Sequence, residues 1–256
     1  MNKNFILSIS MIAVLMAGCT SHKKLMYLSN LDTTSVEQFF PLDRPDYRIQ
    51  YQDILYINIS TLNQDMNSLI NPVSQQLTNN IYREESSIYI FGYTVGDSGT
   101  VTIPILGDIH VVDSTIQEVK QSVELRAREF VKDAVVNIRL LSFKFTVIGE
   151  VNNPGTYTNF NNQLTVLDAI GMAGDITDFG NRQRILVVRP TDNGSRTYRV
   201  NVQDKNLLTS EGYFLLPNDI VIVEPIKSKP FQLNIPSMAL LLTTISTLIL
   251  VLSFIK

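Results

Sequence analysis

The stretch that decides the fold is Phe143–Tyr157, FKFTVIGEVNNPGTY. Phe143, Phe145 and Val147 alternate with polar residues, which is the period-two pattern of a strand that buries one face. Asn153–Gly155 then places Pro at position i+1 and Gly at position i+2 of a type II turn. The stretch therefore predicts a β-hairpin that begins a folded unit near residue 143.

The residues after this hairpin predict a helix, a second hairpin and a last strand. Thr165 caps a short helix whose first turn includes Asp168, and Gly174 follows at its C-terminal end. The turn signal Asp192–Ser195 lies between two strand-like segments, and Ile220–Val223 predicts a last buried strand. The order ββ-α-ββ-β over residues 143–226 is typical of a small α+β fold.

Upstream, residues 46–142 predict another α+β unit. Asp53–Ser60 is rich in β-branched and aromatic residues and predicts a strand. Asn63–Ser87 is polar and lacks a clear period, so we expect an extended loop or insertion there. Tyr89–Val112 contains two short strands separated by Asp and Gly turn residues.

An amphipathic helix and a strand complete this unit. Thr115 and Glu118 are spaced as a capping box, in which the hydroxyl and the carboxylate each bond to a free backbone N–H group. Apolar residues then recur at spacings of 3, 4, 4 and 3, at Ile116, Val119, Val123, Ala127 and Phe130. The spacing predicts one buried stripe, and the alternation of residues 136–140 predicts the strand after it.

The N-terminal residues 1–18 have the parts of a secretory signal, with Lys3, an apolar run and small residues before Cys19. Leu15–Cys19 resembles the bacterial lipobox, in which the cysteine is acylated and becomes the first mature residue. Cys19 is the only cysteine, so we expect it to carry the lipid. An ordinary signal peptide or membrane anchor with an incidental cysteine is the alternative. Residues 19–45 are expected to be a tether, and Thr20 in place of Asp resembles lipoproteins that pass to the outer membrane.

Charge and composition exclude several classes of protein. The net charge is −3, and removal of residues 1–18, whose only charged residue is Lys3, leaves −4. With no basic run beyond Lys23 and Lys24, nucleic acid is not an expected partner. A single cysteine excludes a disulfide within the chain, and His22 and His110 lack neighbours at metal-ligand spacing. We expect no metal and no cofactor.

Catalytic motifs are also missing from the sequence, which has no P-loop, dinucleotide fingerprint or GxSxG. Glu150, Asp168, Asp175 and Asp178 are close in sequence, and two of them could be imagined as a glycosidase pair. However, Asp168 falls in the first turn of a predicted helix, where it stabilises the helix dipole. The sequence therefore does not predict an enzyme.

Several motifs together resemble the outer-membrane polysaccharide export family, the translocons for capsule and exopolysaccharide. The matching segments follow one another in family order: Tyr47–Leu55, Tyr93–Gly107, Val147–Tyr157, Leu167–Asp175 and Leu216–Val221. The resemblance implies a polysaccharide export domain over residues 46–142 and one soluble-ligand-binding β-grasp domain over 143–226. Larger members carry a second β-grasp repeat, and Asn63–Ser87 is longer than the family's usual connection.

The C-terminal residues 237–256 predict a transmembrane helix. Met238–Ile255 has 18 residues without a charge, and 18 to 20 residues at about 1.5 Å each span roughly 30 Å. Four hydroxyl-bearing residues lie on one side of this helix at 100° per residue, namely Thr243, Ser246, Thr247 and Ser253. Either several copies ring a pore that these hydroxyls line, or the helix is a plain anchor whose hydroxyls bond to their own backbone.

The resemblance favours the pore, because family members are known for a helical barrel in the outer membrane. Eight helices in a ring leave a lumen of very roughly 15 Å, since one helix is about 10 Å across. We therefore expect a homo-oligomeric ring that conducts polysaccharide from the periplasm to the cell surface, supplied by an inner-membrane co-polymerase or tyrosine-kinase-like partner. A periplasmic glycan- or partner-binding lipoprotein without a pore is the alternative.

Overall fold

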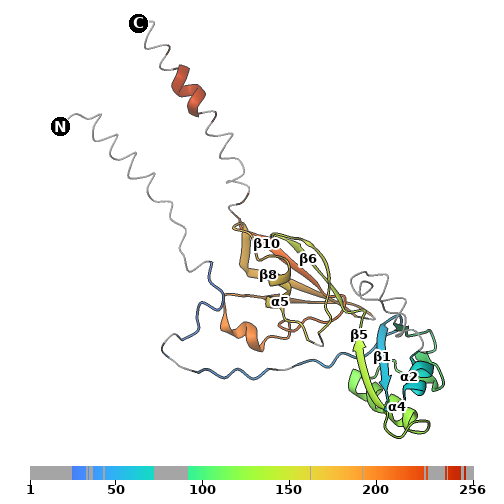
Figure 1. The fold of residues 1–256 in the computed structure, drawn as a ribbon. Coiled ribbons are helices and arrows are strands. Elements are labelled where there is room, and N and C mark those ends of the chain that lie inside the picture. Colours follow the sequence, from blue (N-terminus) through green and yellow to red (C-terminus); the bar gives the residue numbers. More distant parts are fainter. Residues whose placement is uncertain are drawn as a thin grey trace.

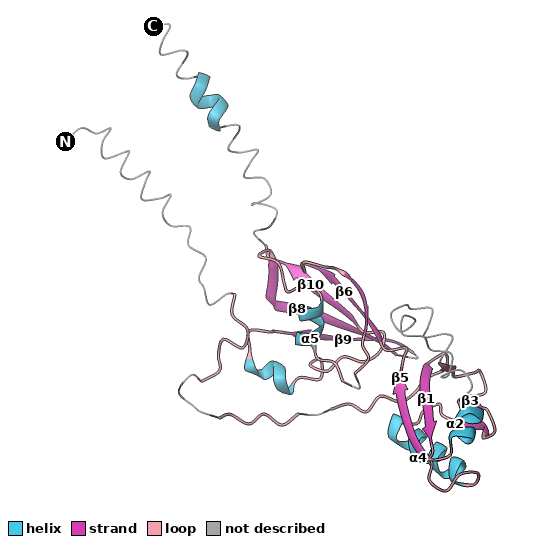
Figure 2. Cartoon of the chain, in the orientation of Figure 1, coloured by secondary structure: helices cyan, strands magenta, loops and turns pink. Residues whose placement is uncertain are grey.

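The fold is taken from a computed structural model. It describes residues 25–71 except 33, 35, 36 and 43, residues 92–227 except 162 and 192, and residues 229, 240, 242–248 and 251. The described chain forms two units, each around its own hydrophobic core, joined near residue 142 (Figure 1). Both units mix helices and strands (Figure 2), so the predicted α+β class is confirmed.

The first unit, the N-terminal unit, has a small antiparallel sheet and a separate hairpin that enclose one core. The sheet has the order β2-β1-β5, and β3 pairs with β4. The strands are β1 (Ile54–Ser60), β2 (Tyr93–Thr94), β3 (Thr100–Ile103), β4 (Gly107–His110) and β5 (Val135–Leu140). The strands predicted at 53–60 and 136–140 are confirmed as β1 and β5, which lie side by side.

Helix α4 (Ile116–Arg128) packs one face into this core. The capping box is confirmed: Glu118 N donates to the Thr115 hydroxyl at 3.2 Å, and Thr115 N donates to the Glu118 carboxylate at 2.7 Å. The predicted stripe is buried at Val119, Val123 and Ala127. The prediction was wrong for Phe130, because the helix ends before this residue and its side chain is 46% exposed.

Helix α2 (Gln64–Ile70) occupies part of the segment predicted as an extended loop, so that prediction was wrong for residues 64–70. The asparagines that made the segment look irregular bind backbone groups and fix the helix. Asn71 accepts a hydrogen bond from Ile59 N at 3.1 Å and donates to Ile59 O at 2.6 Å, which joins the end of α2 to strand β1. Ile70 is 1% exposed, and this burial selects the helix despite the polar composition.

The second unit, the β-grasp unit, is a five-stranded sheet of order β7-β6-β10-β8-β9. Strands β6 and β10 are parallel, and the other neighbouring pairs are antiparallel. Its elements are β6 (Lys144–Gly149), β7 (Gly155–Thr158), α5 (Val166–Met172), β8 (Gly180–Thr191), β9 (Gly194–Val200), the 3-10 helix η4 (Lys205–Thr209) and β10 (Ile220–Pro225). The predicted order of strands and helix is confirmed.

The connection between β6 and β7 is not the tight turn that the sequence predicts. Gly155 already pairs with Val147 inside the hairpin, and the residue with positive φ is Gly149, at +94°. A Cβ atom at Gly149 would lie 2.2 Å from the carbonyl oxygen of Val223 on β10. Glycine is therefore required where β6 approaches β10, and the five residues after it cross toward the end of α5, where Asn153 N donates to Ala173 O at 2.8 Å.

Part of the predicted tether is bound to the β-grasp unit. Leu28 N donates to Val202 O at 2.9 Å, and Ser29 N donates to Gln203 O at 2.8 Å. The hydroxyl of Tyr27 donates to Asp175, and its ring lies 5.8 Å from the Arg182 guanidinium. Residues 27–30 thus belong structurally to the β-grasp unit and are held close to the first residues of β8.

No helix within the described parts of the chain is both long enough and apolar enough to cross a membrane. Of the transmembrane helix predicted over residues 237–256, only residues 240, 242–248 and 251 are described, and they are helical. The rest of that prediction, like Cys19 and the signal segment, lies outside the described residues.

Candidate functional site at the junction of the two units

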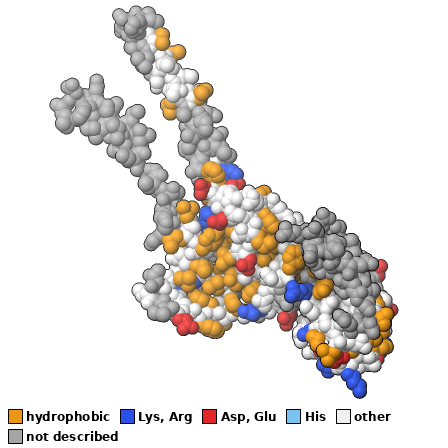
Figure 3. Space-filling model, viewed as in Figure 1, with side chains coloured by type: hydrophobic (Ala, Val, Ile, Leu, Met, Phe, Trp, Pro, Cys, Tyr) orange, Lys and Arg blue, Asp and Glu red, His pale blue; other side chains and the backbone are white. Residues whose placement is uncertain are grey.

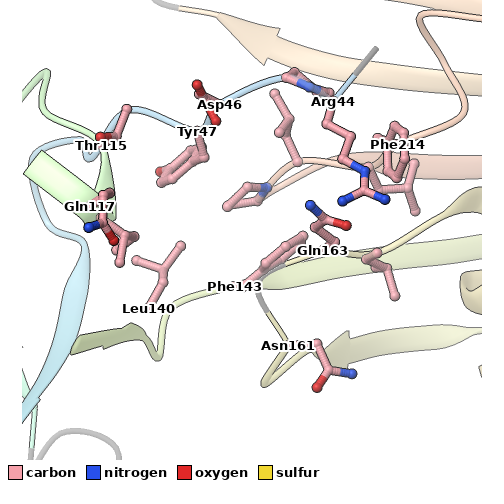
Figure 4. A pocket seen from close by; sticks show the side chains of 16 residues that line it. Arg44, Asp46, Tyr47, Thr115, Gln117, Leu140, Phe143, Asn161, Gln163 and Phe214 are labelled. Carbon is pink, nitrogen blue, oxygen red and sulfur yellow. The ribbon is translucent and has the colours of Figure 1, made fainter. Parts of the chain in front are cut away.

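A cavity of about 470 Å³ lies where the two units meet (Figure 4). One wall is the connecting segment 44–47, a second is the start of α4, and the third belongs to the β-grasp unit. Its lining residues are Arg44, Pro45, Asp46, Tyr47, Thr115, Ile116, Gln117, Leu140, Phe143, Asn161, Gln163, Leu164, Phe214, Leu215, Leu216 and Pro217. Because three separate segments supply the walls, the cavity exists only when both units are held in one relative position.

The Asp53 carboxylate, which is 6% exposed, holds the side of the junction that belongs to the N-terminal unit. It accepts hydrogen bonds from the Tyr47 hydroxyl at 2.7 Å, from Gln50 N at 2.9 Å and from the Ser142 hydroxyl at 2.7 Å. Burial, together with the Asp53 charge, raises the pKa of Tyr47, so this hydroxyl stays protonated and donates. Asp53 thus joins the connecting segment, the turn before β1 and the joint between the units.

On the β-grasp side, a buried ion pair fixes the loop that forms the cavity wall. Asp219, which is 0% exposed, lies 2.8 Å from the Arg189 guanidinium and also accepts from Leu216 N at 2.8 Å. Arg189 donates a further bond to Phe214 O at 2.7 Å. Burial raises the pKa of Asp219, and the hydrogen bonds from Arg189 and Leu216 oppose this shift. The buried Arg189–Asp219 pair therefore holds loop 214–217 through hydrogen bonds to Phe214 O and from Leu216 N.

The cavity combines an apolar floor with a polar rim. Phe143, Leu164 and Phe214 are each at most 8% exposed and form the floor. The exposed side chains around them are Arg44, Asp46, Gln117, Asn161 and Gln163. In Figure 4 the Arg44 side chain extends toward Gln163 and Phe214, whereas Asp46 lies at the rim. Such a mixture is typical of a site that orients a polar ligand on an apolar surface.

The residues predicted to line a pore lie on the C-terminal segment, away from this cavity. Thr243 donates to Leu240 O at 2.8 Å, Ser246 to Leu242 O at 2.8 Å, and Thr247 to Thr243 O at 2.6 Å. Each described hydroxyl therefore bonds to its own helix, as the anchor alternative supposes, while its oxygen remains able to accept. Ser253 and Cys19 lie outside the described residues, so the pore and the lipid site stay predictions.

Three of the four clustered carboxylates, Glu150, Asp168 and Asp175, have structural partners. Asp168 lies in the first turn of α5, as predicted, and also closes a capping box with Thr165, while Asp175 accepts from Tyr27. Glu150 forms an ion pair with Lys229 and accepts from Thr177 at 3.0 Å. His110 lies in strand β4, as expected. Among the described residues, no three His, Cys, Asp or Glu side chains gather as a metal site.

Comparison with known proteins accounts for both units. Residues 42–141 match the family model described as polysaccharide biosynthesis/export protein, and residues 143–223 match the SLBB domain. The chain belongs to the polysaccharide export protein family. The two matches meet at the junction described above, so the cavity lies between the export domain and the SLBB domain.

Curated relatives of the chain carry names that refer to polysaccharide export or production. The EPS I polysaccharide export outer membrane protein EpsA of Ralstonia nicotianae is 32% identical over 104 residues, covering 39% of this chain and 27% of the relative. The exopolysaccharide production protein ExoF of Rhizobium meliloti is 29% identical over 120 residues, covering 45% of this chain and 28% of the relative. The chain thus spans little more than a quarter of the length of these relatives.

The motifs of the family could be recognised in the sequence, but their physical role could not. Asp53 and Asp219 stand within the quoted segments Tyr47–Leu55 and Leu216–Val221. Each acid directly precedes an apolar strand and proves to be buried, which is the signal that could have predicted a structural carboxylate. Arg44 and Gln163 carry no local signal, because only the meeting of the two units places them at one cavity.

Proposed function

We propose that this protein is a lipid-anchored outer-membrane subunit that exports capsular polysaccharide or exopolysaccharide. Cys19 carries the lipid, residues 237–256 cross the membrane and the two described units face the periplasm. The observation that carries the proposal is the pair of family matches, which follow one another over residues 42–223. The names of the relatives in Ralstonia and Rhizobium support the same role.

The arrangement of the chain ends supports attachment to one membrane. Leu28 lies beside Val202, and Val202 N donates to Arg182 O near the start of β8. The end of β10 lies on the other side of β8, where Pro225 pairs with Gly180. Three strand spacings of about 4.8 Å separate these points, so the chain enters and leaves the SLBB domain about 15 Å apart.

Short connections then suffice to bring both tethers to the same bilayer. Cys19 precedes Tyr27 by eight residues, and Pro236 follows Lys229 by seven. Connections of this length extend at most about 28 Å. The ion pair between Lys229 and Glu150 holds the exit of the chain against the SLBB domain. A lipid at residue 19 and a helix at residue 237 are therefore compatible with one membrane.

The conduit itself is a homo-oligomeric ring of C-terminal helices. Eight copies would leave a lumen of roughly 15 Å. Thr243, Ser246, Thr247 and Ser253 face its lumen and present hydroxyl oxygens to the passing polymer. Acidic and basic side chains are interspersed on the face seen in Figure 3, which suits passage without strong adsorption. An inner-membrane co-polymerase or tyrosine-kinase-like partner supplies the polymer, and this chain performs no catalysis.

Imaging of the extracted protein tests the proposal. Detergent-solubilised full-length protein should form rings of uniform size in negative stain, and Cys19→Ser should lose the lipid and its recovery with outer membranes. The double variant Thr243→Leu/Thr247→Leu should impair export. Ile245→Val/Leu248→Ile, on the opposite side of the helix, is the matched control. A uniform monomer, or normal export by the Thr variant, would overturn the conduit.

The junction cavity favours one alternative, a periplasmic lipoprotein that binds a glycan or a partner protein without forming a pore. This alternative needs the tether and the cavity but no ring. A monomeric particle that retains saccharide binding would establish it in place of the conduit.

A further inference from the structure

The junction cavity has features that the conduit does not use. Its floor is apolar and buried, and its volume of about 470 Å³ lies in the range of small-ligand sites. It is remote from the C-terminal residues proposed to line the pore. A passive wall needs neither the Gln163 amide nor the Arg44 guanidinium at this position.

The Arg44 guanidinium is the feature that selects a ligand class. It extends into the cavity beside Gln163 in Figure 4, and no hydrogen bond or ion pair joins it to another residue in the described part of the chain. Arg182, Arg189 and Arg199, by contrast, each donate to a carbonyl or a carboxylate. An arginine whose planar donors face a cavity is suited to a carboxylate, which it binds through two parallel hydrogen bonds.

An amide and two aromatic rings add a second requirement. The Gln163 amide, which lies beside the Arg44 side chain in Figure 4, offers both donors and an acceptor, as hydroxyl groups on a ring require. Phe143 and Phe214 present apolar surface to the interior, which suits the aliphatic face of a pyranose. A hydroxylated pyranose ring that carries a carboxylate suits Arg44, Gln163 and the two aromatic rings together.

We propose that the cavity binds one or two residues of an acidic saccharide, with its carboxylate on Arg44 and a hydroxyl on Gln163. The choice of a saccharide rests on the proposed function, since the ligand is then a stretch of the exported polymer. Because both units contribute walls, a bound saccharide contacts both and stabilises one relative position of the export and SLBB domains. The cavity thus couples the presence of polymer to the geometry of the junction.

Titration calorimetry on the full-length protein in detergent tests this site, with trigalacturonate as the acidic probe and cellotriose as the neutral one. Trigalacturonate should bind saturably, and cellotriose should bind at least about tenfold more weakly, because it lacks the charge-assisted hydrogen bond to Arg44. Arg44→Gln should remove this preference. Arg196→Gln, an exposed position on β9, is the matched control and should leave both affinities unchanged. Unchanged melting curves exclude misfolding of the variants.

The binding results test the saccharide site, and they do not depend on whether the protein forms a ring. Equal binding of the two probes, or full binding by Arg44→Gln, would overturn the carboxylate at Arg44, and binding of neither probe would overturn the site. Should Arg44→Gln lower the melting temperature, Gln163→Ala provides the second test, with weaker binding of both probes expected. Failure of the proposed function would instead be seen as a lack of rings in protein that still binds trigalacturonate.

Discussion

Replacing Asp53 by Ala should release the junction between the two domains. Three donors lose their acceptor, namely the Tyr47 hydroxyl, Gln50 N and the Ser142 hydroxyl. Each hydrogen bond to a charged acceptor contributes about 1.5–3 kcal/mol when its partner is buried. The contributions are not additive, because Tyr47 is only half-buried and its hydroxyl can turn to water.

We therefore expect Asp53→Ala to lower the free energy of unfolding of the export domain by about 2–4 kcal/mol. For a domain of this size, such a loss lowers the melting temperature by about 10 °C or more. Far-UV circular dichroism measures the transition, which is convenient because the chain has no tryptophan. Hydrogen exchange should accelerate over residues 44–56, because the connecting segment and the turn before β1 lose their common acceptor.

Asp97→Ala is the matched control for this experiment. Asp97 lies exposed in the turn before β3, and its substitution should leave both measurements unchanged. Asp53 does not hold the junction if Asp53→Ala melts within about 3 °C of Asp97→Ala and exchanges at the wild-type rate, since single surface changes seldom shift the melting temperature by more than that. The three hydrogen bonds would then contribute nothing to the junction.

Three further changes test other parts of the fold. Gly149→Ala should destabilise the SLBB domain by about 3 kcal/mol or more, because the residue has positive φ and its new Cβ would meet a carbonyl oxygen of β10; an unchanged chemical denaturation midpoint would contradict this. Asn71→Ala should cost about 2–3 kcal/mol, since it leaves both buried backbone groups of Ile59 unpaired, and wild-type amide exchange at Ile59 would refute it. The hydrogen bond from Lys229 lowers the pKa of Glu150 below its usual 4.5, so this contact stabilises the fold above that pH and is lost as pH falls through the lower folded value. The melting temperatures of wild type and Glu150→Gln should thus differ at pH 7 and converge in acid, and a constant difference would argue against the pair.

Local patterns were sufficient wherever the chain contacts mainly its own neighbours. The capping boxes at Thr115 and Thr165 could be predicted because both partners stand three residues apart. The order of the strands along the chain in the SLBB domain followed from period-two segments separated by turn residues. The hairpin of β8 and β9 is one example. These interactions are short in sequence, so composition and spacing determine them.

Predictions failed where distant segments decide the local backbone. Asn63–Ile70 has a polar composition, yet α2 forms because Ile70 is buried and Asn71 binds strand β1. Gly155 carries the sequence signal of a turn, yet Gly149 has the positive φ, because only there does β6 approach β10 closely enough to exclude a Cβ atom. Both outcomes depend on contacts that no window of neighbouring residues contains.

By itself the sequence determined the class of protein, the order of its elements and the two segments expected to reach the membrane. Those properties follow from local propensity, period and motif order, which are carried by consecutive residues. Only the tertiary structure decided that Asp53 and Asp219 hold the walls of one cavity and that Arg44 extends into it. It also placed residues 27–30 and the end of β10 on either side of β8. The physical reason is that a cavity between two units, and the distance between two chain ends, are set by packing and register across the whole chain.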